Sequence, residues 1–294
     1  MPRPLSGTRI LLTGASGGIG SHLTMRLARE GTHLALVAYP GMDLGPLRQA
    51  AARPGLTTSH LVSDLRLPDE WNRVARWAEN ELGGVDVLIN NAGVEFTRQF
   101  HRLSETAVAE ILRVNLEAPM MLTRALLPGM LARGHGHIVN MSSLAGCAGP
   151  ALQEGYAATK AGLRGFTASL RASYRGHGIS ASVVCPGFVS TGIYPRICAT
   201  AGRSAPFLLG PVSPERVGDA VIRAIQTDAP EIIVSKYPVR PILALAALAP
   251  RWGEWLANQL GGNEFFRAAA RAAEEEATAA SPPPPPNIGN STAS

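Results

Sequence analysis

The stretch Thr13-Gly14-Ala15-Ser16-Gly17-Gly18-Ile19-Gly20 follows an apolar run at 8–13 and precedes a segment of helical periodicity at 21–30. Glycine lets a chain turn tightly and lets a phosphate approach the backbone. The N-terminus of the following helix offers unpaired N–H groups and the positive end of the helix dipole. This strand–turn–helix unit indicates a nucleotide-binding α/β fold, although an ordinary glycine-rich turn has the same composition.

The chain up to residue 235 repeats this alternation of short apolar runs and helical patterns. Strands are expected at 8–13, 33–38, 58–63, 85–90, 137–141, 179–185 and 231–235. Helices are expected at 21–30, 68–82, 104–133, 154–175 and 214–226. Such alternation predicts a doubly wound parallel sheet, a Rossmann fold of about seven strands with helices on both faces.

The composition divides the chain into three regions. Residues 1–235 are expected to form one Rossmann-type domain, in which the segment 188–212, interrupted by proline and glycine, is irregular. Residues 236–276 are expected to form a helical extension. Residues 277–294 contain five consecutive prolines and small polar residues, which predicts a disordered tail.

The helical extension contains the apolar run 242–249, with Arg240 before it, Arg251 after it, and two tryptophans beyond. We favour a helix that packs on its own domain or on another subunit. The alternative is peripheral contact with a membrane through 239–260, because interfacial helices combine the same apolar, aromatic and basic residues.

The bulk properties argue against several classes of protein. The net charge is +5 and the pI is near 9.5, but the arginines are scattered, so we expect a solvated basic surface and no nucleic-acid partner. Cys147, Cys185 and Cys198 form no C-x-x-C pair, which indicates a reducing compartment such as the cytoplasm. We expect neither a signal segment nor a spanning helix, which needs roughly 18 apolar residues. The histidines show no metal-ligand spacing, so no metal is expected.

Acid–base chemistry is indicated by Tyr156 and Lys160, because residues four apart share one face of the helix expected at 154–175. An ammonium near a phenol lowers the pKa of the phenol from about 10, which suits proton transfer near neutral pH. Ser143 follows the fifth expected strand, thirteen residues before Tyr156, where its hydroxyl can donate to a carbonyl oxygen. Ser142 points the other way by strand alternation and is expected to be structural.

The G-x-x-x-G-x-G spacing of the glycine-rich turn and the Y-x-x-x-K pair resemble the short-chain dehydrogenase/reductase family. Asn90-Asn91-Ala92-Gly93 after the fourth expected strand and Pro186-Gly187 after the sixth match further motifs of that family. The resemblance covers residues 6 to 235, with the motifs in the family's order. It implies a catalytic domain that interconverts a carbonyl and a secondary alcohol by hydride transfer with NAD(P).

The resemblance also implies a role for each catalytic residue. Ser143 and Tyr156 would hydrogen-bond the developing alkoxide, with Tyr156 as the general acid/base, and Lys160 would bind the nicotinamide ribose. Asn115 matches the family's fourth catalytic position. Pro119, four residues later, has no N–H for the Asn115 carbonyl, so that carbonyl is expected to hold a water that links Lys160 to solvent.

The resemblance places the cofactor against the carboxyl ends of the strands. The residues expected to bind it are Gly14, Ser16, Gly18, Ile19, Gly20, Tyr39, Asp64, Leu65, Asn91, Ala92, Gly93, Tyr156, Lys160, Pro186, Gly187, Val189 and Thr191. Asp64 and Leu65 match the family's adenine contact, and Val189 and Thr191 match the positions that hold the carboxamide. For Asp64 a surface turn, and for Asn90 a buried role in the sheet, are equal alternatives.

Selectivity for NAD usually places an acidic residue at the end of the second strand, on the ribose 2′-hydroxyl. That position here is Ala38-Tyr39-Pro40, which has no acid. The basic residue found in NADP-preferring relatives is also missing, since Tyr39 and Gly17 occupy its places. The missing acid favours NADP, whereas Asp43 could restore NAD binding if its loop folds back.

A lipophilic substrate is suggested by the segment 188–212, where such enzymes cover the substrate with a lid. Its apolar residues are Phe188, Ile193, Tyr194, Ile197, Phe207, Leu208 and Leu209. A steroid, polyketide, terpenoid or acyl chain would suit this lid, although a subunit contact would use the same residues. The expected substrate contacts are Ser143, Gln153, Tyr156, Ile193 and Tyr194, with a helix cap as the alternative for Gln153.

Other functions on the same fold stay open. An epimerase or dehydratase usually has a G-x-x-G-x-x-G spacing, and a non-catalytic cofactor-binding sensor or scaffold commonly loses the tyrosine or lysine. The resemblance further implies a homodimer or homotetramer that assembles through the helices at 104–133 and 154–175.

Overall fold

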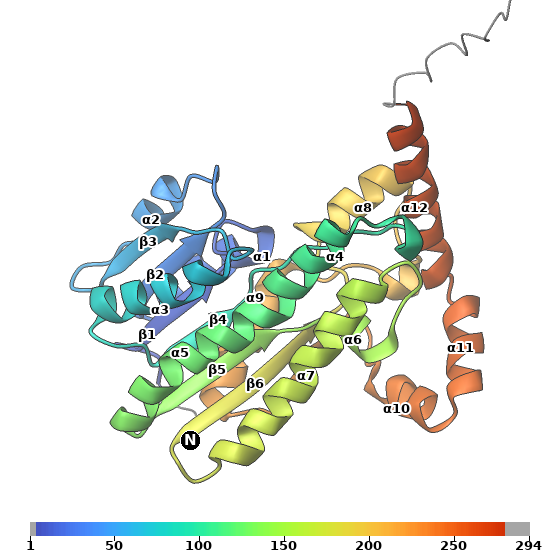
Figure 1. Cartoon of the computed structure of the whole chain (residues 1–294). Helices are drawn as coiled ribbons and strands as arrows, with labels where there is room; N and C mark the ends of the chain where they lie inside the picture. The colour runs from blue at the N-terminus through green and yellow to red at the C-terminus, as the bar shows by residue number, and fades with distance from the viewer. Residues whose placement is uncertain (1–3, 280–294) are drawn as a thin grey trace, which may run out of the picture.

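A seven-stranded sheet lies at the centre of the protein (Figure 1). The structure is a computed structural model that describes residues 4–279. The strands are β1 (Arg9–Thr13), β2 (His33–Ala38), β3 (Thr58–Val62), β4 (Val87–Asn90), β5 (Gly136–Met141), β6 (Ile179–Pro186) and β7 (Glu231–Val234). Their order is β3-β2-β1-β4-β5-β6-β7, and every neighbouring pair is parallel. The predicted doubly wound parallel sheet is confirmed, and its order reverses between β1 and β4, where such sheets bind ligands.

Helices cover both faces of the sheet (Figure 1). On one face pack α1 (Gly18–Arg29), α2 (Gly45–Ala51) and α9 (Pro214–Thr227). On the other face pack α3 (Pro68–Leu82), α5 (Ala118–Arg133) and α7 (Glu154–Tyr174), with α4 (Glu105–Leu112) continuing the line of α5. The remaining helices are α6 (Ala145–Ala148), α8 (Ile193–Ala201), α10 (Arg240–Leu248), α11 (Pro250–Gln259) and α12 (Gly262–Ala279). Short 3-10 turns occur at η1 (Phe100–Arg102) and η3 (Phe207–Leu209).

Because both faces are covered, most residues of the central strands are apolar. Ile10 and Leu12 of β1 belong to one buried core, together with Leu23 and Leu27 of α1. Leu11 belongs to a second core on the opposite face, which includes residues of α3 and α5. Burying one such side chain stabilises the fold by about 1.5–3 kcal/mol, so the two cores hold the strands in register.

Two predicted helices differ from the observed ones. The first begins at Gly18 instead of residue 21, so it starts inside the glycine-rich motif. The long helix expected at 104–133 is interrupted by the π-helical turn η2 (Arg113–Glu117), which separates α4 from α5. Pro119 has no N–H for an i to i−4 hydrogen bond, and a π turn adjusts the helix to that loss.

The prediction that 188–212 is irregular is wrong, because α8 lies within it. Pro195 stands in the first turn of α8, where a missing N–H leaves no hydrogen bond unmade. Gly202 ends the helix in the left-handed conformation, with φ at 62°. A bridge between Val189 and Val212 then closes the segment at its base.

The C-terminal part of the chain forms three helices. Phe265, Phe266 and Ala269 of α12 share a buried cluster with Ile197 of α8. No residue of α10 or α11 is buried. Residues 277–279, which were predicted to begin the disordered tail, instead continue α12 to Ala279. Residues 280–294 lie outside the described residues. No helix within residues 4–279 has both the length and the hydropathy to cross a bilayer.

Phe265 is fully buried where α12 meets α8, with its ring centroid 5.5 Å from that of Phe188. We expect Phe265→Ala to lower the free energy of unfolding by about 3–5 kcal/mol, because it leaves a cavity among aromatic rings. Urea titration followed by circular dichroism measures this loss. The control Phe100→Ala removes a ring that is 49% exposed and should change stability by no more than about 0.5 kcal/mol. Equal losses in the two variants would contradict this account of how α12 is anchored.

Candidate active site

A cavity of about 1490 Å³ lies at the carboxyl ends of the strands. Residues predicted to bind cofactor that line it are Gly14, Ser16, Gly18, Ile19, Gly20, Tyr39, Asp64, Leu65, Asn91, Ala92, Gly93, Tyr156, Pro186, Gly187, Val189 and Thr191. The predicted substrate residues Ser143, Gln153, Ile193 and Tyr194 line it as well. The fold therefore brings these separated motifs to one cavity.

The glycine-rich turn is an open backbone cradle at the start of α1. Gly14 has φ at 65°, and a Cβ there would meet the Ala92 backbone at 2.8 Å. A Cβ on Gly20 would lie 2.0 Å from the Gly14 carbonyl oxygen. Neither a side-chain cap nor an acidic residue occupies the first turn of α1, so its N–H groups and dipole can receive an anion such as a pyrophosphate.

Hydrogen bonds tie the loop after β4 to this turn. The Asn91 side chain donates to the carbonyl oxygens of Thr13 and Gly14, at 3.1 Å each. The Thr13 hydroxyl accepts from the N–H groups of Asn91 and Ala92 at 3.0 and 3.1 Å. Asn90, in contrast, is buried in the sheet and donates to Asn140 Oδ1 at 2.8 Å, which supports the structural alternative for it.

A basic side chain that the sequence analysis missed lies beside Tyr39 and Asp64. Arg66 pairs with both carboxylate oxygens of Asp64, at 2.9 Å from Nε to Oδ1 and 2.7 Å from Nη2 to Oδ2. Its guanidinium also lies 5.0 Å from the centroid of the Tyr39 ring and donates to the Tyr39 hydroxyl. This hydrogen-bonded pair lowers the pKa of Asp64. Arg66 lines the cavity, and its position two residues after Asp64 is the signal that could have found it.

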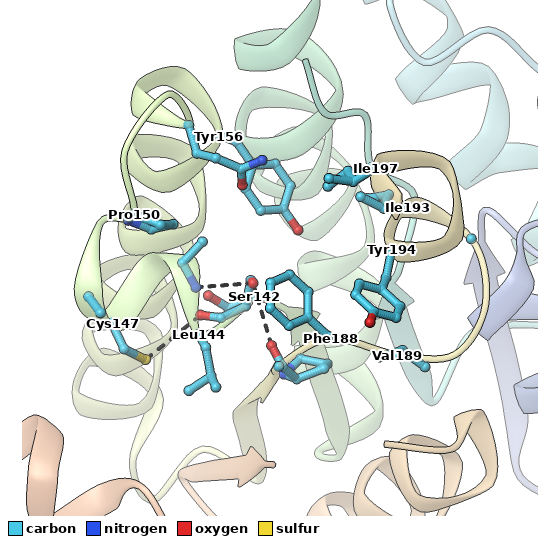
Figure 2. Close-up of a pocket in the computed structure, with 18 of the residues that line it drawn as sticks. Ser142, Leu144, Cys147, Pro150, Tyr156, Phe188, Val189, Ile193, Tyr194 and Ile197 are labelled. Carbon is cyan, nitrogen blue, oxygen red and sulfur yellow. Dashed lines mark hydrogen bonds between the residues drawn. The ribbon is translucent and has the colours of Figure 1, made fainter. Parts of the chain in front are cut away.

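Tyr156 and Ser143 reach the cavity from neighbouring elements. Figure 2 shows the Tyr156 phenol pointing from α7 into the cavity, with Ile193, Tyr194 and Ile197 of α8 across from it. The Ser143 hydroxyl accepts from the Ala145 N–H at 3.1 Å and donates to the Pro186 carbonyl at 3.4 Å. These two hydroxyl groups can therefore approach one small-molecule oxygen in the cavity.

Lys160 lies one helical turn from Tyr156 on the same face of α7, as predicted. Its ammonium nitrogen lies 5.5 Å from the centroid of the Tyr156 ring and donates to the Met141 carbonyl at 2.8 Å. Lys160 is buried behind the cavity wall, and a Cβ on Gly93 would lie 3.5 Å from its nitrogen. Unlike the other predicted cofactor residues, it therefore does not itself line the cavity.

Asn115 holds the same stretch of backbone from the π-helical turn. Its side chain donates to the Val94 carbonyl and accepts from the Val94 N–H, both at 2.8 Å. The residue is fully buried, and its Oδ1 lies 3.4 Å from a Cβ built on Gly93. Asn115 and Lys160 thus converge on Gly93 from behind the cavity. The water expected on the Asn115 carbonyl stays a prediction.

The predicted lowering of the Tyr156 pKa is wrong for this structure, where burial moves it the other way. Burial raises the pKa of Tyr156 to about 12, a hydrogen bond from Ser143 opposes this, and the Glu95 carboxylate adds to it. Burial also lowers the pKa of Lys160 to about 8. At neutral pH the phenol therefore holds its proton and can donate it, and the ammonium keeps most of its charge.

Comparison with known proteins decides the family. The family model for short chain dehydrogenases matches residues 8–201. This chain belongs to the short-chain dehydrogenase family. It is thus an oxidoreductase that acts on CH–OH or C=O groups.

Its relatives cover most of the chain. Ketoacyl reductase HetN of Nostoc sp. is 38% identical over 246 residues, 83% of this chain and 84% of that protein. Epidermal retinol dehydrogenase 2 of Mus musculus is 31% identical over 261 residues, 87% of this chain and 83% of that protein. The crystal structure of a metagenomic short-chain oxidoreductase in complex with NADP matches with a TM-score of 0.67 at 32% identity. That match covers 79% of this chain and 98% of the other, and it supports a nicotinamide cofactor in this cavity.

Ser142 is structural, as strand alternation predicted. Its hydroxyl donates to the Lys160 carbonyl at 2.6 Å and is buried. This bond joins the end of β5 to α7, next to the Met141 carbonyl that holds the Lys160 side chain. It therefore fixes the position of α7, from which Tyr156 projects.

Two polar residues that the sequence analysis missed, Glu95 and Thr97, contact the predicted residue Gln153 at the N-terminal end of α7. Gln153 donates to the Glu95 carboxylate at 2.7 Å and to the Thr97 hydroxyl at 2.8 Å. Gln153 makes no side-chain cap on α7, so the alternative role as a helix cap is wrong. Burial raises the pKa of Glu95, and the charge of Arg196 opposes that rise. The signal in the sequence is a carboxylate two residues after Gly93.

We expect Glu95→Gln to lower the pKa of Tyr156, because it removes a negative charge near the phenol and keeps an oxygen that can accept from Gln153. The rise of kcat/KM with pH in alcohol oxidation should then begin at a lower pH. Glu105→Gln, which removes an exposed carboxylate from α4, is the control. An unchanged profile for Glu95→Gln would show that this carboxylate does not act on Tyr156.

Proposed function

We propose that this protein interconverts a carbonyl and a secondary alcohol on a lipophilic small molecule, with NADP as cofactor and Tyr156 as the general acid/base. The observation that carries the proposal is the placement of the Tyr156 and Ser143 hydroxyls in one cavity, against the apolar side chains of α8. The glycine-rich cradle at α1 supports the dinucleotide part of this assignment.

The roles of the residues follow from their positions. A nicotinamide held in this cavity would supply the hydride. In reduction, Ser143 orients the substrate oxygen and Tyr156 donates its phenolic proton to that oxygen as charge develops there. Lys160 keeps a positive charge behind the phenol, and Asn115 holds the loop from Gly93 to Val94 against Lys160.

A lipophilic substrate is supported by the walls of the cavity. On one side lie Phe188 and the α8 side chains Ile193, Tyr194 and Ile197. On another side lie Leu243, Ala246 and Leu256 of the C-terminal helices. Apolar walls with a few polar groups are typical of small-molecule sites. One relative is named for retinol and another for a ketoacyl group, which fits this chemistry.

The preference for NADP is supported by charges around Tyr39. Arg66 lies beside the Tyr39 ring in the cavity, where its guanidinium can pair with a 2′-phosphate. Asp43, the residue that could restore NAD binding, instead accepts from the Gly45 N–H at 2.7 Å within its own turn. The end of β2, where NAD-selective relatives carry an acidic residue, has none.

We also propose a homodimer or homotetramer in the cytoplasm. The line of α4 and α5 exposes large apolar side chains, namely Leu112, Met120, Met121 and Leu131. These helices lie with α7 on one side of the molecule, so a second copy would cover them. The free thiols Cys147, Cys185 and Cys198 suit a reducing compartment.

The test is NADPH oxidation with a panel of lipophilic ketones, for the wild type and for Tyr156→Phe. Loss of the proton donor should lower kcat/KM by about 10²–10⁴-fold and leave NADPH binding intact. Tyr174→Phe makes the same chemical change on the same helix, outside the cavity, and should keep the activity. A wild type that binds NADPH but reduces no ketone would favour the sensor or scaffold, and an isomerised product would favour the epimerase.

We expect Arg66→Gln to raise KM for NADPH roughly tenfold or more, because charge-assisted hydrogen bonds contribute about 1.5–3 kcal/mol. KM for NADH should change little, since NADH has no 2′-phosphate. Arg73→Gln removes an arginine that lies outside the cavity and is the control. Equal changes in the two KM values for Arg66→Gln would overturn the NADP preference.

A further inference from the structure

The two helices α10 and α11 form a hairpin whose outer face is apolar and exposed. Leu245 and Leu248 lie three residues apart on α10, with exposed fractions of 54% and 83%. Trp252 and Trp255 lie three residues apart on α11, with exposed fractions of 38% and 55%. Residues three apart share one helix face, so each helix presents a leucine pair or a tryptophan pair. We call these four residues the outer face.

The other side of the same hairpin is a wall of the cavity. Leu243 and Ala246 of α10, and Gly253, Leu256 and Ala257 of α11, line the cavity, and none of the four outer-face residues does. The hairpin is therefore a single layer of helix with apolar side chains on both sides. The proposed function uses only the inner side of the hairpin.

The hairpin is closely packed on itself and loosely attached to the rest of the protein. A Cβ on Gly253 would lie 2.7 Å from the Ala246 Cβ, so α10 and α11 touch at their backbones. The hairpin also contacts α12, but neither of its helices has a buried residue. Figure 1 shows α10 and α11 standing away from the sheet, beside α12. Within residues 4–279, each of the four outer-face residues stays at least 38% exposed.

The charges of the hairpin that lie outside the cavity are positive. Its charged residues are Arg240, Arg251 and Glu254, and all three are exposed. Glu254 lines the cavity, whereas the two arginines do not. Arg240 contacts Glu231 of β7 and keeps a side chain that is 59% exposed. The hairpin outside the cavity thus combines leucines, tryptophans and arginines, as in helices that lie at a lipid–water interface.

We propose that the outer face of the α10–α11 hairpin docks on the surface of an anionic lipid bilayer. Leucines 245 and 248 enter the acyl region, the indoles of Trp252 and Trp255 lie at the headgroup level, and Arg251 pairs with lipid phosphates. A second copy of the chain is a weaker occupant, because α4, α5 and α7 already offer it an apolar surface.

Docking in this way brings the cavity next to the bilayer with one layer of helix between them. The docking proposal rests on the proposed function and adds the source of the substrate to it, because a lipophilic carbonyl or alcohol concentrates in the bilayer. The substrate could then reach Tyr156 by a small movement of the hairpin, without crossing water. Docking itself requires no turnover, so it can be tested separately from the catalytic assignment.

The first test is flotation of the full chain with phosphatidylcholine vesicles and with vesicles that also contain phosphatidylglycerol. We expect the wild type to float with the anionic vesicles, and the double variant Leu245→Glu, Leu248→Glu to lose roughly tenfold or more of this partition. Leu67→Glu, which alters a leucine that is 53% exposed before α3, is the matched control and should float like the wild type. The double variant should keep its activity on a water-soluble ketone, since neither leucine lines the cavity. Tyr156→Phe should float like the wild type even if it is inactive.

Three results would overturn the proposal: a wild type that stays in solution with anionic vesicles, a double variant that floats like the wild type, or a double variant that changes the oligomeric state in the absence of lipid. The last result would assign the outer face to a second copy.

A second measurement avoids any folding defect of the glutamate variant. Tryptophan fluorescence of the wild type should be quenched by vesicles that carry a shallow lipid quencher. The variant Trp252→Phe, Trp255→Phe keeps Trp71 and Trp77 of α3 and should lose that quenching. Equal quenching in the two proteins would also overturn the proposal.

Discussion

The register of the central parallel strands is the constraint on which the rest of the structure depends. Asn90 of β4 pairs with Asn140 of β5, and Met141 pairs with Val184 of β6, so these strands end at one edge. Asn140 accepts from Asn90 and donates to Thr167 of α7 at 2.9 Å. A slip of one residue would leave these buried amides without partners, which costs about 1–3 kcal/mol for each group. The sheet edge that carries the cavity is therefore held in place by polar contacts as well as by apolar packing.

Burial at that edge sets the chemistry of the site. The same enclosure raises the pKa of Tyr156 and lowers the pKa of Lys160, because it disfavours the charged form of each group. The main chain compensates by placing the Met141 carbonyl against the ammonium. The phenol is thus a proton donor at neutral pH, and the neighbouring charge of Glu95 makes it hold its proton more firmly.

The C-terminal helices complete the cavity that the sheet begins. Aromatic contacts of Phe188 with Phe265 and Phe266 join the end of β6 to α12, and α12 in turn supports α8. The α10–α11 hairpin extends this wall with apolar residues on its inner side. The lipophilic character of the site therefore comes from two segments that lie far apart in the sequence, 188–201 and 240–266.

The sequence by itself determined the doubly wound sheet and the elements that meet at its edge. Local sequence patterns can be recognised without a structure. Here they are the strand and helix periods, the glycine spacing of residues 14–20 and the offsets of Ser143, Tyr156 and Lys160. Only the tertiary structure decided which way the pKa of Tyr156 moves, because burial depends on every element packed around a residue. Glu95 was likewise missed because its partner Gln153 is distant in the chain, and the contact of Arg66 with the distant Tyr39 ring also appears only in the structure. The two sides of the α10–α11 hairpin were also decided only by the tertiary structure. A helical pattern identifies the apolar residues, but it does not tell which of them face a cavity and which face outward.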